Sequence, residues 1–189
     1  LDVLDGAKSA HTKRKEAAGE HGTDTHALVE EYVNVCLARK SVLGMGDVML
    51  AGLWQKDVEA PTKIVKAEHL SLVATFINWT VENVDHFLFA ERQMYDTELF
   101  IAGTADFAYI GKDGKKYMAD FKTSSGIYGI DYWLQVAAYR MLAEGEGDEA
   151  YDGATVVRMG KDGSFEVQQL NEYVLYKEEK YQKNIWSQK

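Results

Sequence analysis

The sequence predicts a single α/β (α+β) domain in which helices pack against a central sheet. Three observations predict this class: apolar residues at helical spacing in the first half, two hairpins built around Lys-Asp-Gly turns, and a helical segment between those hairpins. The chain has 189 residues, of which 46% are hydrophobic, and this is enough for one domain with a sizeable core.

The first half of the chain is expected to be helical, after a small, polar lead-in over residues 1–20. The apolar spacing predicts helices over residues 23–39, within 47–60, and over 68–89. Thr23 is a suitable N-cap for the first of them, because its hydroxyl can accept an orphan backbone N–H. Pro61, the only proline, marks a break before the long helix.

The second half alternates strands, turns and helices. From the turn chemistry and the apolar pattern we expect the following elements: strands over 91–95, 99–110 and 116–123, a helix over 131–143, a hairpin of strands 154–159 and 164–170, and a charged helix over 172–186. The layout is therefore helices, then a mostly antiparallel sheet, then a crossover helix and more sheet.

Charge and cysteine usage exclude several classes of protein. The net charge is -9, so binding to nucleic acid would require local basic patches or bound cations. The single cysteine, Cys36, excludes an internal disulfide framework and a four-cysteine metal or iron–sulfur site. No run is long and apolar enough to span a membrane, no signal peptide is visible, and we expect a cytoplasmic protein. The chain begins at Leu1 rather than Met, which is consistent with a trimmed N-terminus.

The stretch from residue 103 to 122 carries an unusual set of charged residues. Asp106 lies on the first expected strand, and Asp120 and Lys122 lie two apart on the second, so the latter two point to the same face. Burying two carboxylates and an amine is costly without a cation or ligand between them. The alternative is a solvated surface hairpin, since D-x-K triplets are common, and spacing alone leaves both interpretations open.

Four further residues are candidates for the same site. Gln135 and Tyr139 lie four apart, so they share one face of the helix that follows the D-x-K strand. His26 lies on the first helix and Glu91 on a strand. Each also has an ordinary interpretation. Gln135 and Tyr139 could be a polar pair at the edge of the core, His26 a structural or exposed histidine, and Glu91 a charge at a strand edge.

Taken together, these motifs resemble the PD-(D/E)XK nuclease superfamily, in its RecB-like and phage-type exonuclease branch. The matching segments are GTDTH at 22–26, Glu91, GTAD at 103–106, DFK at 120–122 and QVAAY at 135–139. Any one of them is a weak signal, whereas the ordered set is specific and spans about residues 10–145. The resemblance implies that residues 1–189 form one nuclease domain with a restriction-endonuclease-like core, a central mixed sheet flanked by helices.

The resemblance also implies roles for the site residues. Its catalytic set would be Asp106, Asp120, Lys122, His26 and Glu91. A Mg²⁺ or Mn²⁺ ion would be held by Asp106, Asp120, the backbone of Phe121, His26 and Glu91, and no iron–sulfur cluster is implied. Substrate would be positioned by Gln135 and Tyr139, and Lys112 and Lys115 are candidate phosphate contacts.

The function expected from the resemblance is a metal-dependent deoxyribonuclease, an exonuclease in preference to an endonuclease, acting in DNA recombination, repair or phage replication. Its partners would be DNA and a recombination or single-strand-binding protein, in the cytoplasm of a bacterial or phage-infected cell. An oligomer is compatible with this, since some phage relatives form rings. The alternative is a catalytically silent nuclease-fold module that only binds DNA or a partner. Such a module would have lost an acidic residue or the lysine, and none is lost here.

Overall fold

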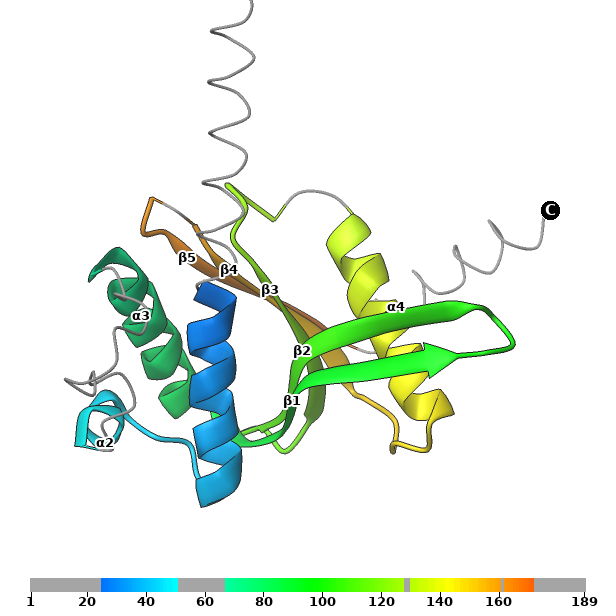
Figure 1. The fold of residues 1–189 in the computed structure, drawn as a ribbon, viewed down its shortest axis with the longest axis horizontal. Coiled ribbons are helices and arrows are strands. Elements are labelled where there is room, and N and C mark those ends of the chain that lie inside the picture. Colours follow the sequence, from blue (N-terminus) through cyan, green and yellow to red (C-terminus); the bar gives the residue numbers. More distant parts are fainter. Residues whose placement is uncertain (1–24, 51–66, 128–129, 161, 172–189) are drawn as a thin grey trace, which may run out of the picture.

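The computed structural model describes residues 25–50, 67–127, 130–160 and 162–171, and these form an α/β structure with a five-stranded mixed sheet flanked by helices (Figure 1). The described elements are a helix over residues 25–39, α2 (Met45–Leu50), α3 (Ala67–Asn83), β1 (Val84–Asp96), β2 (Ile101–Gly111), β3 (Lys116–Lys122), α4 (Asp131–Gly145), β4 (Gly153–Met159) and β5 (Phe165–Asn171). The predicted fold class is confirmed.

The strands of the described sheet lie in chain order, β1-β2-β3-β4-β5. All neighbours are antiparallel except β3 and β4, which are parallel. Parallel neighbours need a crossover connection, and α4 provides it between β3 and β4. The sequence-predicted crossover helix therefore makes the sheet mixed.

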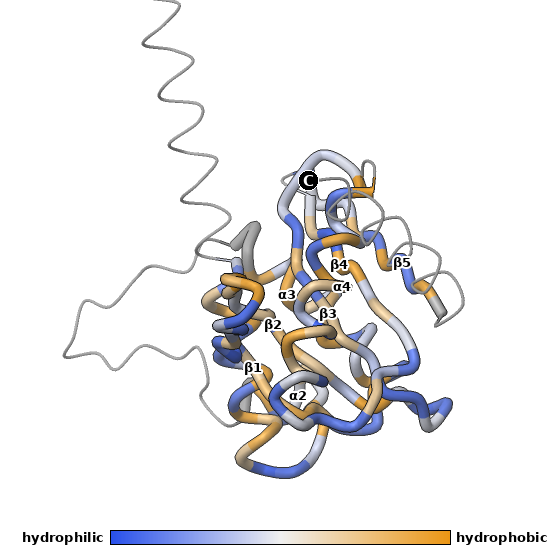
Figure 2. The backbone as a smooth tube through the Cα atoms, turned by 90° about the vertical axis from the view of Figure 1, so that its right-hand side faces the viewer, coloured by the Kyte–Doolittle hydropathy of each residue, from blue (hydrophilic) through white to orange (hydrophobic). Residues whose placement is uncertain are grey.

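The two faces of the sheet are covered by different helices (Figure 1). The helix over residues 25–39 and α3 pack on one face, in a core that includes Phe76, Phe107 and Phe121. α4 packs on the other face, in a core that includes Met118 and Val136. In Figure 2 the strands of this core are mostly hydrophobic, whereas hydrophilic segments gather at the periphery.

The helix over residues 25–39 is tied to its neighbours through Tyr32, which is fully buried. The Tyr32 hydroxyl donates a hydrogen bond to the Leu43 carbonyl at 2.9 Å and lies 2.8 Å from the Thr80 hydroxyl. These contacts fix the helix against α3. They thereby fix the position of His26 at the start of the same helix.

The predicted helix over 68–89 is wrong in its last part, because α3 ends at Asn83 and β1 begins at Val84. Val84, Phe87 and Phe89 in this part are β-branched or aromatic, which favours a strand, and the segment pairs with β2 from Val84↔Gly111 onward. Register shifts between Val84 and His86 and between Phe87 and Phe89 interrupt the alternation that would have marked a strand. The short strand expected over 91–95 is therefore the second half of a 13-residue strand.

The remaining predicted elements are confirmed within two residues at their ends, where they are described. Both Lys-Asp-Gly hairpins are present, and each has its glycine at positive φ: 77° at Gly114 and 81° at Gly163. Thr23, Pro61, the lead-in over residues 1–20, most of the expected 47–60 helix and the helix over 172–186 lie outside the described residues. Within the described part of the chain, no helix is long and apolar enough to cross a membrane.

Candidate active site

The two aspartates lie where strands β2 and β3 separate. The β2–β3 ladder runs from Ile110↔Lys116 to Phe107↔Ala119, and Asp106 and Asp120 are the next residues beyond it. The Asp106 Oδ2 accepts a hydrogen bond from the Phe121 N–H at 2.5 Å. At this point a carboxylate, and not a backbone carbonyl of β2, is therefore the partner of the β3 backbone. β3 itself stays fixed, because Asp120 and Phe121 continue to pair with β4.

Asp120 is the more deeply buried carboxylate, with a residue exposure of 2%. Its Oδ2 forms an ion pair with the Lys122 ammonium and accepts no hydrogen bond from any described residue. Burial raises the pKa of Asp120 to about 6, the charge of Asp106 adds to the rise, and Lys122 opposes it. Burial likewise raises the pKa of Asp106, although the Phe121 N–H opposes that shift.

Lys122 begins a chain of hydrogen bonds that leads onto α4. Its Nζ donates to Gln135 Oε1 at 2.9 Å, and Gln135 Nε2 donates to the Tyr139 hydroxyl at 2.6 Å. The predicted sharing of one helix face by Gln135 and Tyr139 is thus confirmed. The ammonium also lies 5.2 Å from the centre of the Tyr132 ring. Lys122 is therefore held between a carboxylate, an amide oxygen and an aromatic ring.

The missing Cβ of Gly103 predicts close approach of a metal or the DNA backbone to the strand, and the structure places the Tyr139 ring there. A Cβ atom at Gly103 would lie 2.6 Å from Cε1 of the Tyr139 ring, so this glycine leaves the space that the ring occupies. Tyr132 is a residue of the site for which the sequence analysis gave no role. Tyr132 precedes Gln135 by three residues on α4, and this i,i+3 spacing was the signal that could have placed it on the same face.

His26 lies on the other side of the D-x-K strand, at the start of the helix over residues 25–39. Its ring packs against Phe121 with a centroid distance of 5.9 Å. Burial lowers the pKa of His26, the nearby Asp120 partly offsets this, and Lys122 adds to the lowering. The lowered pKa favours the neutral imidazole, which is the form that offers a nitrogen lone pair to a cation.

Glu91 lies on β1 across from Asp106, between the pairs Ala90↔Phe107 and Arg92↔Ala105. Its φ of 45° is in the left-handed region, which is costly for a residue with a Cβ. Burial raises the pKa of Glu91 to about 7, and the charges of Asp106, Glu30 and Asp120 add to the rise. The structure therefore brings Glu91 to the same site as the two aspartates.

The turn lysines are not brought to this site. Lys112 and Lys115 lie in the β2–β3 turn, six and nine residues after Asp106, which corresponds to about 20 Å for the nearer one along an extended strand. Lys112 Nζ donates to the Val81 carbonyl at 2.5 Å, near the end of α3. Their assignment as phosphate contacts stays a prediction, and the geometry separates them from the carboxylates.

The donor set suits a hard divalent cation. The charges of Asp106 and Asp120 raise the pKa of Glu91, and the charge of Asp106 raises that of Asp120, which a cation would reverse. Asp120 Oδ2 forms an ion pair with the Lys122 ammonium. Among the described residues, no three His, Cys, Asp or Glu side chains are placed so that they could hold a metal ion together, so the expected ligand set of Asp106, Asp120, His26 and Glu91 is not preformed. Mg²⁺ commonly binds through one or two carboxylates and keeps several waters, so the pair of aspartates fits it.

Comparisons with known proteins leave the family of this chain open. No protein-family model matches the chain, and no curated protein matches it. Among solved structures, it is similar to the crystal structure of SSO0001, with 19% sequence identity and a TM-score of 0.35. That alignment covers 84% of this chain and 75% of the other.

Proposed function

We propose that the chain is a metal-dependent deoxyribonuclease that hydrolyses phosphodiester bonds. The observation that carries the proposal is the convergence of Asp106, Asp120 and Lys122 at the separation of β2 and β3, with the lysine held by Gln135. Buried carboxylates with raised pKa beside a fixed ammonium are costly for the fold, and such arrangements are concentrated at functional sites.

Each of these residues has a task in phosphodiester hydrolysis. Asp106 and Asp120 would hold a Mg²⁺ or Mn²⁺ ion. When bound, this ion would neutralise charge on the phosphoryl group and lower the pKa of a water bound to it. Lys122 donates hydrogen bonds, so its ammonium can orient the attacking water or contact a phosphoryl oxygen. The water oxygen bonds to phosphorus and releases a proton to solvent as the P–O bond to the leaving nucleotide breaks, and the departing oxygen takes up a proton. Gln135 and Tyr139 keep Lys122 in place during this step.

His26 and Glu91 complete the proposed site from the opposite side. His26 is kept neutral by burial, so it can support a cation without adding positive charge. Glu91 would become more fully ionised if a cation were bound at the site, because its raised pKa arises from burial and like charges. The exonucleolytic mode, a role in recombination, repair or phage replication, a single-strand-binding or recombination partner, and a cytoplasmic location rest on the sequence resemblance alone.

The test is a nuclease assay on end-labelled linear duplexes, single strands and a covalently closed circle, with and without Mg²⁺ or Mn²⁺. We expect cleavage of linear DNA only when the metal is present, with mononucleotides released and the circle left intact. Asp120→Asn and Lys122→Met should each lower the rate by at least about 100-fold. Asp85→Asn, an equally small change at an exposed carboxylate of β1, is the matched control and should retain activity.

Two results would count against the proposal. If Asp120→Asn or Lys122→Met kept full activity, the cleavage would not depend on this site. A wild-type protein that binds DNA tightly but never cuts it would support the alternative of a silent binding module.

A further inference from the structure

Tyr132 is a partly buried residue of the candidate site whose hydroxyl group has no partner among the described residues. It lies in the first turn of α4 and packs against the core that includes Met118 and Val136. The buried tyrosines of the described structure each take part in a hydrogen bond through the hydroxyl, as expected for a phenol removed from water. The Tyr132 hydroxyl is not among the buried atoms that lack a partner, so this edge of the ring reaches solvent.

The ring stands beside the lysine of the site. Lys122 Nζ lies 5.2 Å from the ring centre, although the lysine is already held by Asp120 and Gln135. Tyr132, Gln135 and Tyr139 follow one another at spacings of three and four residues, so they form one stripe along α4. A hydrogen bond joins Gln135 to Tyr139, and Tyr132 is the end of the stripe outside that bond. Its ring is therefore available to a ligand that reaches Lys122.

A ligand that brings a phosphate to Lys122 also brings a nucleobase near this ring. In a nucleotide the base and the phosphate are attached to the same sugar, so they lie within a few bonds of each other. Tyrosine rings stack on nucleobases, and this stacking tolerates any sequence because every base has a π-face. Asp131 is exposed beside Tyr132, and its carboxylate opposes a further phosphate contact there. Recognition at this end of the stripe is therefore by stacking and not by charge.

Stacking on the Tyr132 ring requires a base with an accessible face. Inside a duplex each base is covered by its neighbours above and below, so proteins reach base faces where a strand is unpaired. The Tyr132 side chain is held against the core of α4, so the base has to come to the ring. The Lys122 side chain is 18% exposed, so a phosphate has to approach α4 and β3 closely to touch it. A single strand can make this approach more easily than a duplex.

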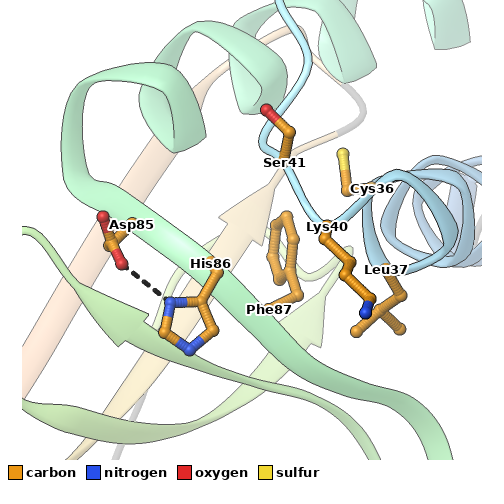
Figure 3. A pocket seen from close by; sticks show the side chains of 7 residues that line it. All are labelled: Cys36, Leu37, Lys40, Ser41, Asp85, His86 and Phe87. Carbon is orange, nitrogen blue, oxygen red and sulfur yellow. Dashed lines mark hydrogen bonds and ion pairs between the residues drawn. The ribbon is translucent and has the colours of Figure 1, made fainter.

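Another lysine with an aromatic ring nearby, shown in Figure 3, lacks these properties. The Phe87 ring lies between Lys40 and His86 in a depression of about 400 Å³. Phe87 is 6% exposed, so its ring offers little surface to a base. The Asp85 side chain is 64% exposed and pairs with His86, so a carboxylate lies close to where a phosphate would bind. The Tyr132 ring is therefore the better match to a nucleotide.

We propose that Tyr132 stacks on the base beside the scissile phosphate, and that the DNA substrate is a single strand at that point. The proposal rests on the nuclease function proposed above and names the class of DNA that the site takes. A ring that stacks equally well in the bound substrate and in the transition state contributes uniform binding. Its loss should therefore raise KM and leave kcat unchanged.

The test measures kcat and KM of the full chain on a single-stranded oligonucleotide with Mg²⁺. Tyr132→Leu should raise KM by about 10- to 100-fold, the effect of losing one base–aromatic stack, with the same kcat. Tyr132→Phe keeps the ring and should behave like the wild type, because the hydroxyl has no described partner. Tyr95→Leu removes a tyrosine that is 67% exposed on β1, and this matched control should also behave like the wild type.

A substrate without the base tests the proposal with no change to the protein. The nucleotides on the two sides of the scissile phosphate are made abasic, one at a time. At one of these positions the wild-type KM should rise by the same factor as in Tyr132→Leu, and the variant should show no further rise on that substrate. A flush-ended duplex should be cut at least about 10-fold more slowly than the single strand, because its end pair has to open first.

Three results would each overturn the inference. They are an unchanged KM in Tyr132→Leu, a fall in kcat at constant KM, which would mean that the ring only holds Lys122, and equal rates on single strand and duplex. If Tyr132→Leu fails to fold, the abasic substrates with the wild type still decide. Any of these results together with cleavage leaves the nuclease function standing. A wild type that cuts neither substrate would refute that function, and this inference with it.

Discussion

Replacing Gly103 by alanine should disturb the candidate site without removing any of its polar groups. The added Cβ would lie 2.6 Å from Cε1 and 3.3 Å from Cδ1 of Tyr139. Carbon atoms in ordinary contact are about 3.5–4.0 Å apart, so the Tyr139 ring has to move by about 1 Å. Tyr139 is buried, with a residue exposure of 9%, in the core beside α4, so its ring moves only if its neighbours or the helix move too.

The expected loss of stability follows from two opposing effects. Overpacking a well-packed core typically costs about 1–3 kcal/mol. Gly→Ala also restricts the unfolded chain, which stabilises the fold by about 0.4–1 kcal/mol where the backbone conformation suits alanine. Gly103 has no positive φ, so this second effect applies. The free energy of unfolding should therefore fall by about 1–2 kcal/mol.

Denaturant unfolding measures this change, and a second substitution identifies its cause. Gly145→Ala is the matched control, because its Cβ would meet nothing within 4 Å, and it should be neutral or stabilising. In a Tyr139→Ala background the cost of Gly103→Ala should disappear, which gives a coupling free energy of at least about 1 kcal/mol. An equal cost with and without the Tyr139 ring would refute the reasoning.

Three further predictions concern stability and can be read from unfolding midpoints. Tyr32→Phe should lower the free energy of unfolding by about 1–3 kcal/mol, because the Leu43 carbonyl loses its Tyr32 donor and the Thr80 hydroxyl keeps only its hydrogen bond to the Ile77 carbonyl. Burial would raise the pKa of Asp148, but hydrogen bonds from Tyr151 and Arg92 outweigh it and lower that pKa. The ionised Asp148 therefore stabilises the fold above the pKa of the unfolded chain, and this stabilisation is lost as the pH falls through the pKa of the folded protein. Asp148→Asn should therefore flatten the acid side of the stability profile, and an unchanged acid limb would contradict this. The pKa of Glu91 is raised to about 7, so its destabilising effect grows as the pH rises from about 4.5 to 7. Glu91→Gln should stabilise the metal-free protein at pH 8 more than at pH 5, and the opposite order would contradict the assignment.

The sequence predicted the fold wherever local chemistry and tertiary pairing agreed. Glycine at the required position of both Lys-Asp-Gly turns led to the correct hairpins. The boundary at Asn83 was missed because Val84 to Phe89 contains apolar residues that suit either a helix or a buried strand, and two register shifts removed the alternation. Only pairing with β2 decides between the two, and that is a tertiary effect.

Contacts within the site could be predicted from the sequence where both residues lie on one helix or strand. Contacts between residues on different elements could be predicted only in part. Spacing placed Asp120 with Lys122, and Gln135 with Tyr139, and both pairs are in contact. The geometry that joins the two pairs depends on how α4 lies on the sheet, which no spacing rule gives. The space that Gly103 leaves for the Tyr139 ring depends on the same packing.

Three irregular features of the described structure lie at the carboxylates of the candidate site. Asp106 interrupts the β2–β3 ladder, Glu91 adopts a left-handed backbone conformation across from it, and Asp120 Oδ2 is one of two buried side-chain atoms without a hydrogen bond among the described residues. Phe121 packs its ring against Phe107 at 4.9 Å on the opposite face, which helps to hold the strand in this arrangement. A sequence selected for stability alone would remove such features with a few substitutions, because each is costly where it stands. Their presence together, at one point of an otherwise well-packed sheet, is what we expect if the site has the function proposed above.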